Sequence, residues 1–77
     1  MASVFYFHNG QTADTILALI KVLENLDEDT FKYHCNKDKN DFFDWISTGL
    51  NDAKAAAAIK TAEARKTMLT KLKRIKH

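Results

Sequence analysis

The chain has 77 residues, of which 45% are apolar and 29% are charged, a composition typical of one globular domain. A single cysteine excludes an internal disulfide and favours a reducing, cytoplasmic setting, and the apolar runs are too short to span a membrane. The net charge of +2 divides into −5 over residues 1–52 and +7 over residues 53–77, an asymmetry that favours an acidic partner or an anionic surface.

Residues 1–11 are predicted to form an extended arm and a turn. Ser3 to Phe7 is β-branched and aromatic, and Asn9-Gly10 readily supplies the positive φ that a turn needs. Because one strand cannot make a sheet by itself, we expect the arm to pack flat on helices or to pair with a strand of another chain.

Two helices are predicted next, over residues 12–26 and 27–36. Thr12 or Asp14 can cap the first, and Asp27 can cap the second. Leu26 and Phe31 occupy the two positions of a hydrophobic staple around that second cap, and Glu28 with Lys32 forms an i, i+4 pair. The first helix carries its apolar side chains at helical spacing: Ile16, Leu19, Ile20, Leu23 and Leu26.

A polar loop then leads to a third predicted helix, residues 40–50, which contains all three aromatic residues of the second half of the chain, Phe42, Phe43 and Trp45. Asn40 or Asp41 can cap it. Asn51 tolerates the left-handed conformation that ends helices, and Asp52 can cap the following helix.

Residues 52–76 are predicted to form one basic C-terminal helix or a pair of helices, because Ala, Lys, Leu and Arg dominate the segment. A pair would break near residues 60–62, with Thr61 as the second cap. One continuous helix would instead turn Lys66, Lys73 and Arg74 away from a buried stripe. That stripe would consist of Ala57, Thr61, Ala64, Met68, Leu72 and Ile75.

These elements predict an all-α, or mostly α, fold for a single domain over residues 1–77: a compact bundle of four to five short helices with a short extended N-terminal arm. Trp45→Ala is expected to remove about 3 to 5 kcal/mol of stability. The predicted core is Phe5, Phe7, Ile16, Leu19, Ile20, Leu23, Phe31, Phe42, Trp45, Ile46, Leu50, Ile59, Met68 and Leu72.

Several blocks together resemble a small, functionally uncharacterised helical domain of prokaryotes, including archaea, that is often attached to the ends of longer chains. The most specific blocks are Phe31 with Tyr33-His34, Asn40-Asp41-Phe42 and Trp45-Ile46. Such relatives usually have glycine where this chain has Asn51, and their tails are more mixed in charge. The resemblance implies a helical fold and no catalytic residues that could be transferred.

The chemistry-bearing residues favour structural roles. His34 and Cys35 are adjacent on a helix and point about 100° apart, so they are not expected to share a metal or to act as a nucleophile and base. His34 is instead expected to be buried and hydrogen-bonded to a loop or to an acid such as Asp41. Asp38, Asp41 and Asp44 are spaced by three, but they lack the alternating oxygen ligands and the central glycine of a calcium loop. We expect no enzyme activity, no metal, no cofactor and no small-molecule substrate.

The leading functional hypothesis is a non-catalytic interaction module that docks a protein partner or associates with itself, motivated by the resemblance and by the unpaired arm. The alternative is a nucleic-acid-binding protein whose basic C-terminal helix makes sequence-independent phosphate contacts. No membrane attachment is expected, because the tail lacks large interfacial aromatic residues. The candidate nucleic-acid-binding residues are Lys66, Lys71, Lys73, Arg74 and Lys76.

Overall fold

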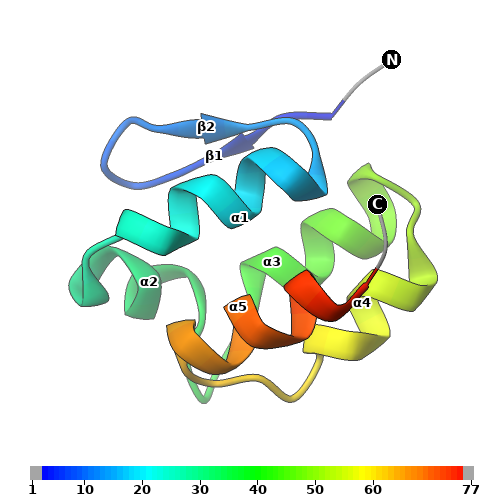
Figure 1. Cartoon of the computed structure of the whole chain (residues 1–77). Coiled ribbons are helices and arrows are strands. Elements are labelled where there is room, and N and C mark those ends of the chain that lie inside the picture. Colours follow the sequence, from blue (N-terminus) through cyan, green and yellow to red (C-terminus); the bar gives the residue numbers. More distant parts are fainter. Residues whose placement is uncertain (1–2, 76–77) are drawn as a thin grey trace.

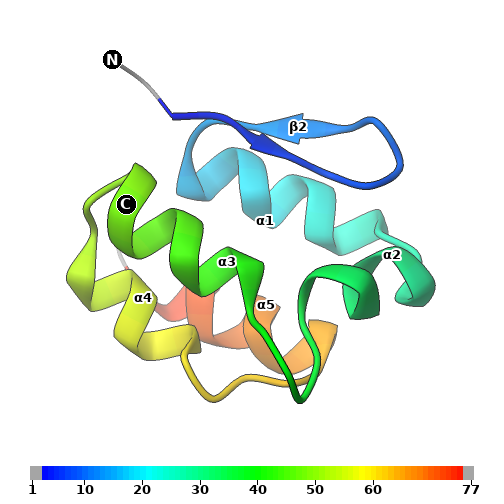
Figure 2. The ribbon, with the colours of Figure 1, turned by 180° about the vertical axis from the view of Figure 1, so that it is seen from behind.

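The computed structural model describes residues 3–75, which form a mostly α-helical bundle with a two-stranded antiparallel sheet at the N-terminal end. The sheet covers α1, and the later helices lie on the other side of α1 (Figures 1 and 2). The elements are β1 (Phe5–Tyr6), β2 (Thr12–Ala13), α1 (Ile16–Asn25), α2 (Glu28–His34), α3 (Asp41–Asp44), η1 (Trp45–Gly49), α4 (Ala53–Ile59) and α5 (Arg65–Arg74). The fold class expected from the sequence is confirmed.

The N-terminal arm is one strand of a hairpin within the chain. Phe5 pairs with Ala13 and Tyr6 with Thr12, and Gly10 adopts a φ of +96° in the connecting turn. The turn expected at Asn9-Gly10 is therefore confirmed, but the expected helix over residues 12–26 begins late, because residues 12 and 13 belong to β2. The arm therefore has a partner strand within the chain and is not the single strand expected from the sequence.

Three caps expected from the sequence are confirmed, and one is displaced. Asp27, Asn40 and Asp52 each accept a hydrogen bond from the backbone N–H three residues later, at 2.9 to 3.0 Å. The backbone and side-chain hydrogen bonds from Thr30 hold the pKa of Asp27 below its usual range. The cap of α1 is Thr15 rather than Thr12 or Asp14, because β2 ends immediately before it.

The third helix changes its winding half way along. It begins as α3 and continues as η1, a π-helical turn in which the Leu50 N–H donates to the carbonyl of Trp45 at 3.0 Å. Asn51 then adopts the expected left-handed conformation, with a φ of +53°. This wider turn brings Gly49 against the indole of Trp45 and the side chain of Ser3.

Gly49→Ala is expected to destabilise the protein by about 1 to 3 kcal/mol, although alanine is the better helix former by about 1 kcal/mol. A β-carbon at Gly49 would lie 2.8 Å from Trp45 Cδ1 and 2.6 Å from Ser3 Oγ. Urea unfolding followed by circular dichroism measures the change, with Thr48→Ala on the same turn as the control. A gain in stability would show that the indole moves aside without cost and would contradict this packing.

The basic C-terminal segment is a pair of helices, which decides between the two alternatives left open by its sequence. α4 ends at Ile59, whose carbonyl accepts a hydrogen bond from Asn40 Nδ2 at 3.2 Å. Thr61 is not the second cap: α5 follows Ala64, which makes no side-chain capping bond. The continuous stripe predicted for a single helix is also wrong, since Ala57, Thr61 and Ala64 are exposed.

The core lies between the hairpin, α1 and the later helices, and it includes the predicted side chains, except that Leu50 is only partly buried. Phe42 is fully buried and stacks on Phe5 and Phe31, with ring centroids 4.9 and 5.7 Å apart. β1 and α3 are thereby joined through the rings of the core. In residues 3–75, α5 packs against α1 on one side and α4 on the other, which sets the direction of its basic side chains.

Candidate functional site

The basic side chains of α5 diverge toward its two neighbouring helices. Lys73 Nζ lies 2.9 Å from Glu24 Oε2 on α1, so its charge is already paired within the chain. Arg65 lies at the other end of α5, where its Nη1 donates to the carbonyl of Leu23 at 2.8 Å and its Nε contacts Glu28 at 3.3 Å. Arg65 therefore provides a hydrogen-bond donor and a positive charge to the carbonyl groups at the C-terminus of α1. The expected Glu28 to Lys32 pair is replaced by this contact.

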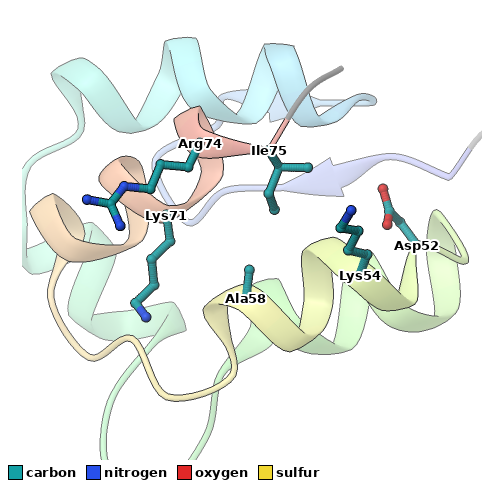
Figure 3. Close-up of a pocket in the computed structure, with 6 residues that line it drawn as sticks. All are labelled: Asp52, Lys54, Ala58, Lys71, Arg74 and Ile75. Carbon is teal, nitrogen blue, oxygen red and sulfur yellow. The ribbon is translucent and has the colours of Figure 1, made fainter.

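A hollow of about 530 Å³ separates α4 from α5, and two of the predicted binding residues line it. Figure 3 shows Asp52 and Lys54 at the start of α4 on one side and Lys71 on α5 on the other, with the side chain of Arg74 extending from α5 away from Lys54. The lining side chains are Asp52, Lys54, Ala58, Lys71, Arg74 and Ile75. Its volume falls in the range of about 300 to 1,000 Å³ that is common for binding pockets.

The cations of the hollow have no ion-pair partner within residues 3–75. The ion pairs of that part of the chain involve Lys39, Arg65 and Lys73, together with the His34 contact to Asp41. Lys54, Lys71 and Arg74 therefore make no ion pair within residues 3–75, and the carboxylate of Asp52 lies beside Lys54 in the same lining (Figure 3). Ala58 and Ile75 supply apolar surface between these cations, the floor of the hollow. Such a surface can bind an anionic group beside an apolar one.

The five residues predicted to bind nucleic acid do not form one surface. Lys71 and Arg74 line the hollow, whereas Lys66 is exposed on the first turn of α5 and does not line it. Lys73 is paired with Glu24, and Lys76 lies outside the described residues.

Four lining residues were not among those predicted: Asp52, Lys54, Ala58 and Ile75. Lys54 lies in the basic segment of residues 53–77, so its positive charge alone made it a possible binding residue. Its position across from Lys71, however, depends on the reversal of the chain between α4 and α5 (Figure 3). No local pattern specifies that reversal, because it follows from which sides of the two helices are buried.

His34 occupies the structural role expected for it. The ring is buried, its Nε2 accepts a hydrogen bond from the His8 backbone N–H at 2.9 Å, and its Nδ1 lies 3.0 Å from Asp41 Oδ2. The His8 contact assigns the proton to Nδ1, which donates to Asp41. Both ring nitrogens are thus engaged within the protein, and neither is available to a ligand in this arrangement.

Cys35 is buried, and its thiol donates to the carbonyl of Ala62 at 3.2 Å. It therefore contacts the turn between α4 and α5 and does not meet the imidazole of His34, as the helix geometry predicts. Burial raises the pKa of this thiol, and the negative charges of Glu63 and Asp41 raise it further. The side chain is a buried neutral group.

Native Cys35 is expected to react with iodoacetamide at least about 100-fold more slowly at pH 8 than in the unfolded chain, because the thiolate is both disfavoured and inaccessible. Mass spectrometry of alkylated samples with and without urea measures the ratio. Glutathione, added to each reaction, gives the reference rate of a free thiol. Equal rates in native and unfolded protein would contradict the burial of Cys35.

No three His, Cys, Asp or Glu side chains within residues 3–75 come close enough to hold a metal ion. Over the same range, no helix combines the length and the apolar character required to cross a bilayer.

The exposed aromatic rings lie away from the hollow. Tyr6, with 73% of its surface exposed, belongs to β1, and the half-exposed Tyr33 belongs to α2 and stacks on His8 at 4.1 Å. The neighbours of Tyr6, Phe5 and Phe7, are buried, an alternation typical of a strand with one buried face. These rings consequently do not interleave with the cations of α4 and α5.

Comparison with protein-family models, with curated proteins and with solved structures found no match to this chain.

Proposed function

We propose that this chain is a non-catalytic interaction module that docks a polypeptide partner in the hollow between α4 and α5. One observation carries the proposal: three cations without an intramolecular ion pair in residues 3–75 surround an apolar floor. Protein interfaces commonly combine an apolar centre with a charged rim, and arginine is enriched among the residues that contribute most to binding.

Docking of a distinct partner is favoured over strand exchange between copies of the chain. Self-association was expected because the N-terminal arm was predicted to lack a partner strand. That reason no longer applies, since β1 pairs with β2 of the same chain. Two acids of the first half, Glu24 and Glu28, already contact Lys73 and Arg65. The hollow brings together three cations, Lys54, Lys71 and Arg74, that make no ion pair within residues 3–75.

Nucleic-acid binding is the alternative, and the distribution of charge makes it the weaker one. A phosphate backbone needs a continuous track of cations, and single-stranded nucleic acid also uses exposed aromatic rings beside them. Lys73 is neutralised by Glu24, and Tyr6 and Tyr33 lie on β1 and α2. Lys66 could extend the track from Lys71 and Arg74.

A photocrosslinking residue placed at Thr67 tests the docking proposal. Thr67 is exposed on α5, one turn before Lys71, and the same crosslinker at the exposed Leu17 on α1 is the matched control. Irradiation of the cells that make the protein is expected to yield a polypeptide adduct at Thr67 that is lost in Lys71→Glu/Arg74→Glu. No adduct, or one that persists after this charge reversal, would overturn the proposal.

A mobility-shift assay with duplex and single-stranded DNA, at about 50 and 200 mM salt, tests the alternative. The docking proposal expects no shift at the lower salt. A shift that disappears at the higher salt, and also in Lys66→Glu/Lys71→Glu/Arg74→Glu, would replace the docking proposal with nucleic-acid binding.

A further inference from the structure

We infer that the partner segment seated in the hollow is acidic and places one apolar side chain on Ala58 and Ile75. This inference rests on the proposed docking function and names the chemistry of its occupant. It follows from three properties of the lining: the sign of its charge, its apolar floor and the order of its charged groups.

The charge of the lining selects an anionic occupant. Lys54, Lys71 and Arg74 contribute three positive charges, and Asp52 contributes one negative charge. Asp52 is partly engaged already, because its Oδ1 accepts the Ala55 N–H at 3.0 Å as the cap of α4. The planar guanidinium of Arg74 can form two parallel hydrogen bonds with a carboxylate. Carboxylates are therefore the complementary groups for the end of the hollow that Lys71 and Arg74 line.

The floor of the hollow selects an apolar side chain between those carboxylates. Ala58 and Ile75 are both half-buried and lie between the cationic walls (Figure 3). Ala58 keeps the hollow open because its side chain is a single methyl group. A purely polyanionic ligand would leave this apolar surface in contact with water, whereas a leucine or phenylalanine of a peptide would cover it.

The order of the charges predicts how the segment lies. In Figure 3, Lys71 and Arg74 are at one end of the hollow, whereas Lys54 and Asp52 are at the other. Carboxylates are therefore most favourable beside Lys71 and Arg74, and Asp52 repels them at the opposite end. The apolar anchor lies between these two ends.

The test uses a synthetic 12-residue peptide of Asp and Glu that carries one Leu and one Phe four positions apart. Binding to the full ¹⁵N-labelled chain is followed by NMR, and the amide shifts are expected to centre on Ala58, Lys71 and Arg74. A second peptide replaces Leu and Phe with Ser at the same charge, and we expect it to bind about 10-fold more weakly. Equal binding by the two peptides would overturn the inference.

Ala58→Leu tests the hollow without changing its charge. Leucine preserves helix propensity and fills the space above the floor, so peptide binding is expected to weaken at least about 10-fold. Ala57→Leu, at an exposed neighbouring position that does not line the hollow, is the matched control and is expected to stay within about 2-fold. Thermal melts verify that both variants fold. Undiminished binding by Ala58→Leu would overturn the inference.

Charge reversal gives a second, independent readout that leaves the floor intact. Arg74→Glu is expected to weaken binding at least about 10-fold, whereas Lys66→Glu on the same helix is expected to weaken it by less than about 3-fold. An equal effect of the two substitutions would indicate diffuse attraction and overturn the inference. Preferential binding of a 12-nucleotide single-stranded DNA, lost in the same variants, would also overturn it.

The two proposals fail in different ways. If the acidic peptide does not bind but Thr67 still crosslinks to a polypeptide, the acidic partner is wrong and docking stands. If the peptide binds and no cellular polypeptide crosslinks, the hollow accepts acidic peptides in solution but the docking function is wrong.

Discussion

Trp45→Ala is expected to lower the free energy of unfolding by about 3 to 5 kcal/mol, enough to unfold a large fraction of a domain this small. The indole is 8% exposed and packs edge-on against Phe5, with ring centroids 5.6 Å apart. Gly49 lies against Cδ1 of the same indole. Alanine would therefore leave a cavity between β1 and η1 that the surrounding helices can fill only in part.

Urea unfolding followed by circular dichroism measures this loss, since Trp45 is the only tryptophan and its fluorescence disappears with the substitution. Trp45→Phe is expected to cost only about 1 to 2 kcal/mol. It keeps an aromatic ring and removes Nε1, which is buried without a hydrogen-bond partner in residues 3–75. Tyr6→Ala, at an exposed position, is expected to change stability by about 0.5 kcal/mol or less. A Trp45→Ala variant of wild-type stability would contradict the core assignment.

His34→Ala is expected to cost about 2 to 4 kcal/mol, although the side chain is polar. The ring packs against Phe5 and Phe42, with centroids 5.0 and 5.7 Å away. Its Nε2 also accepts the His8 backbone N–H, and alanine would leave that donor without its acceptor. The hydrogen bond joins the turn of the hairpin to the end of α2, and the ring contacts join the end of α2 to β1 and α3.

Two substitutions separate these contributions. His8→Ala keeps the backbone N–H and removes only an exposed ring stacked on Tyr33, so we expect a loss of about 1 kcal/mol or less. Asp41→Asn retains an oxygen that can accept from His34 Nδ1 and is expected to cost about 1 kcal/mol. If His34→Ala were no more costly than His8→Ala, the buried network would not contribute to stability.

The caps and the core were predictable because their rules are local. Asp27, Asn40 and Asp52 each bond the backbone N–H three residues ahead, so the sequence around each cap contains both partners. Apolar residues at helical spacing identify a buried side in the same way, as Leu19 and Leu23 show. The left-handed Asn51 follows from the ease with which asparagine adopts that conformation.

The hairpin could not be predicted with the same rules. β2 is two residues long, and Thr12 followed by Asp14 and Thr15 resembles the start of a helix as closely as it resembles a strand. Only its pairing with β1 distinguishes the two, and that pairing requires the turn at Gly10 to bring the segments together. The π-helical turn was likewise not predicted, because it depends on the packing of Gly49 against Trp45 and Ser3.

A mostly helical bundle, its caps, most of its core and an excess of positive charge in the last third of the chain all follow from local patterns of residues. The tertiary structure alone decided which of those charges remain available for binding. Lys73 is paired with Glu24 on α1, a helix distant in the sequence, whereas Arg74, the next residue, lines the hollow and makes no ion pair within residues 3–75. Coulomb energy depends on distance in space, and the folding of α4 and α5 sets those distances.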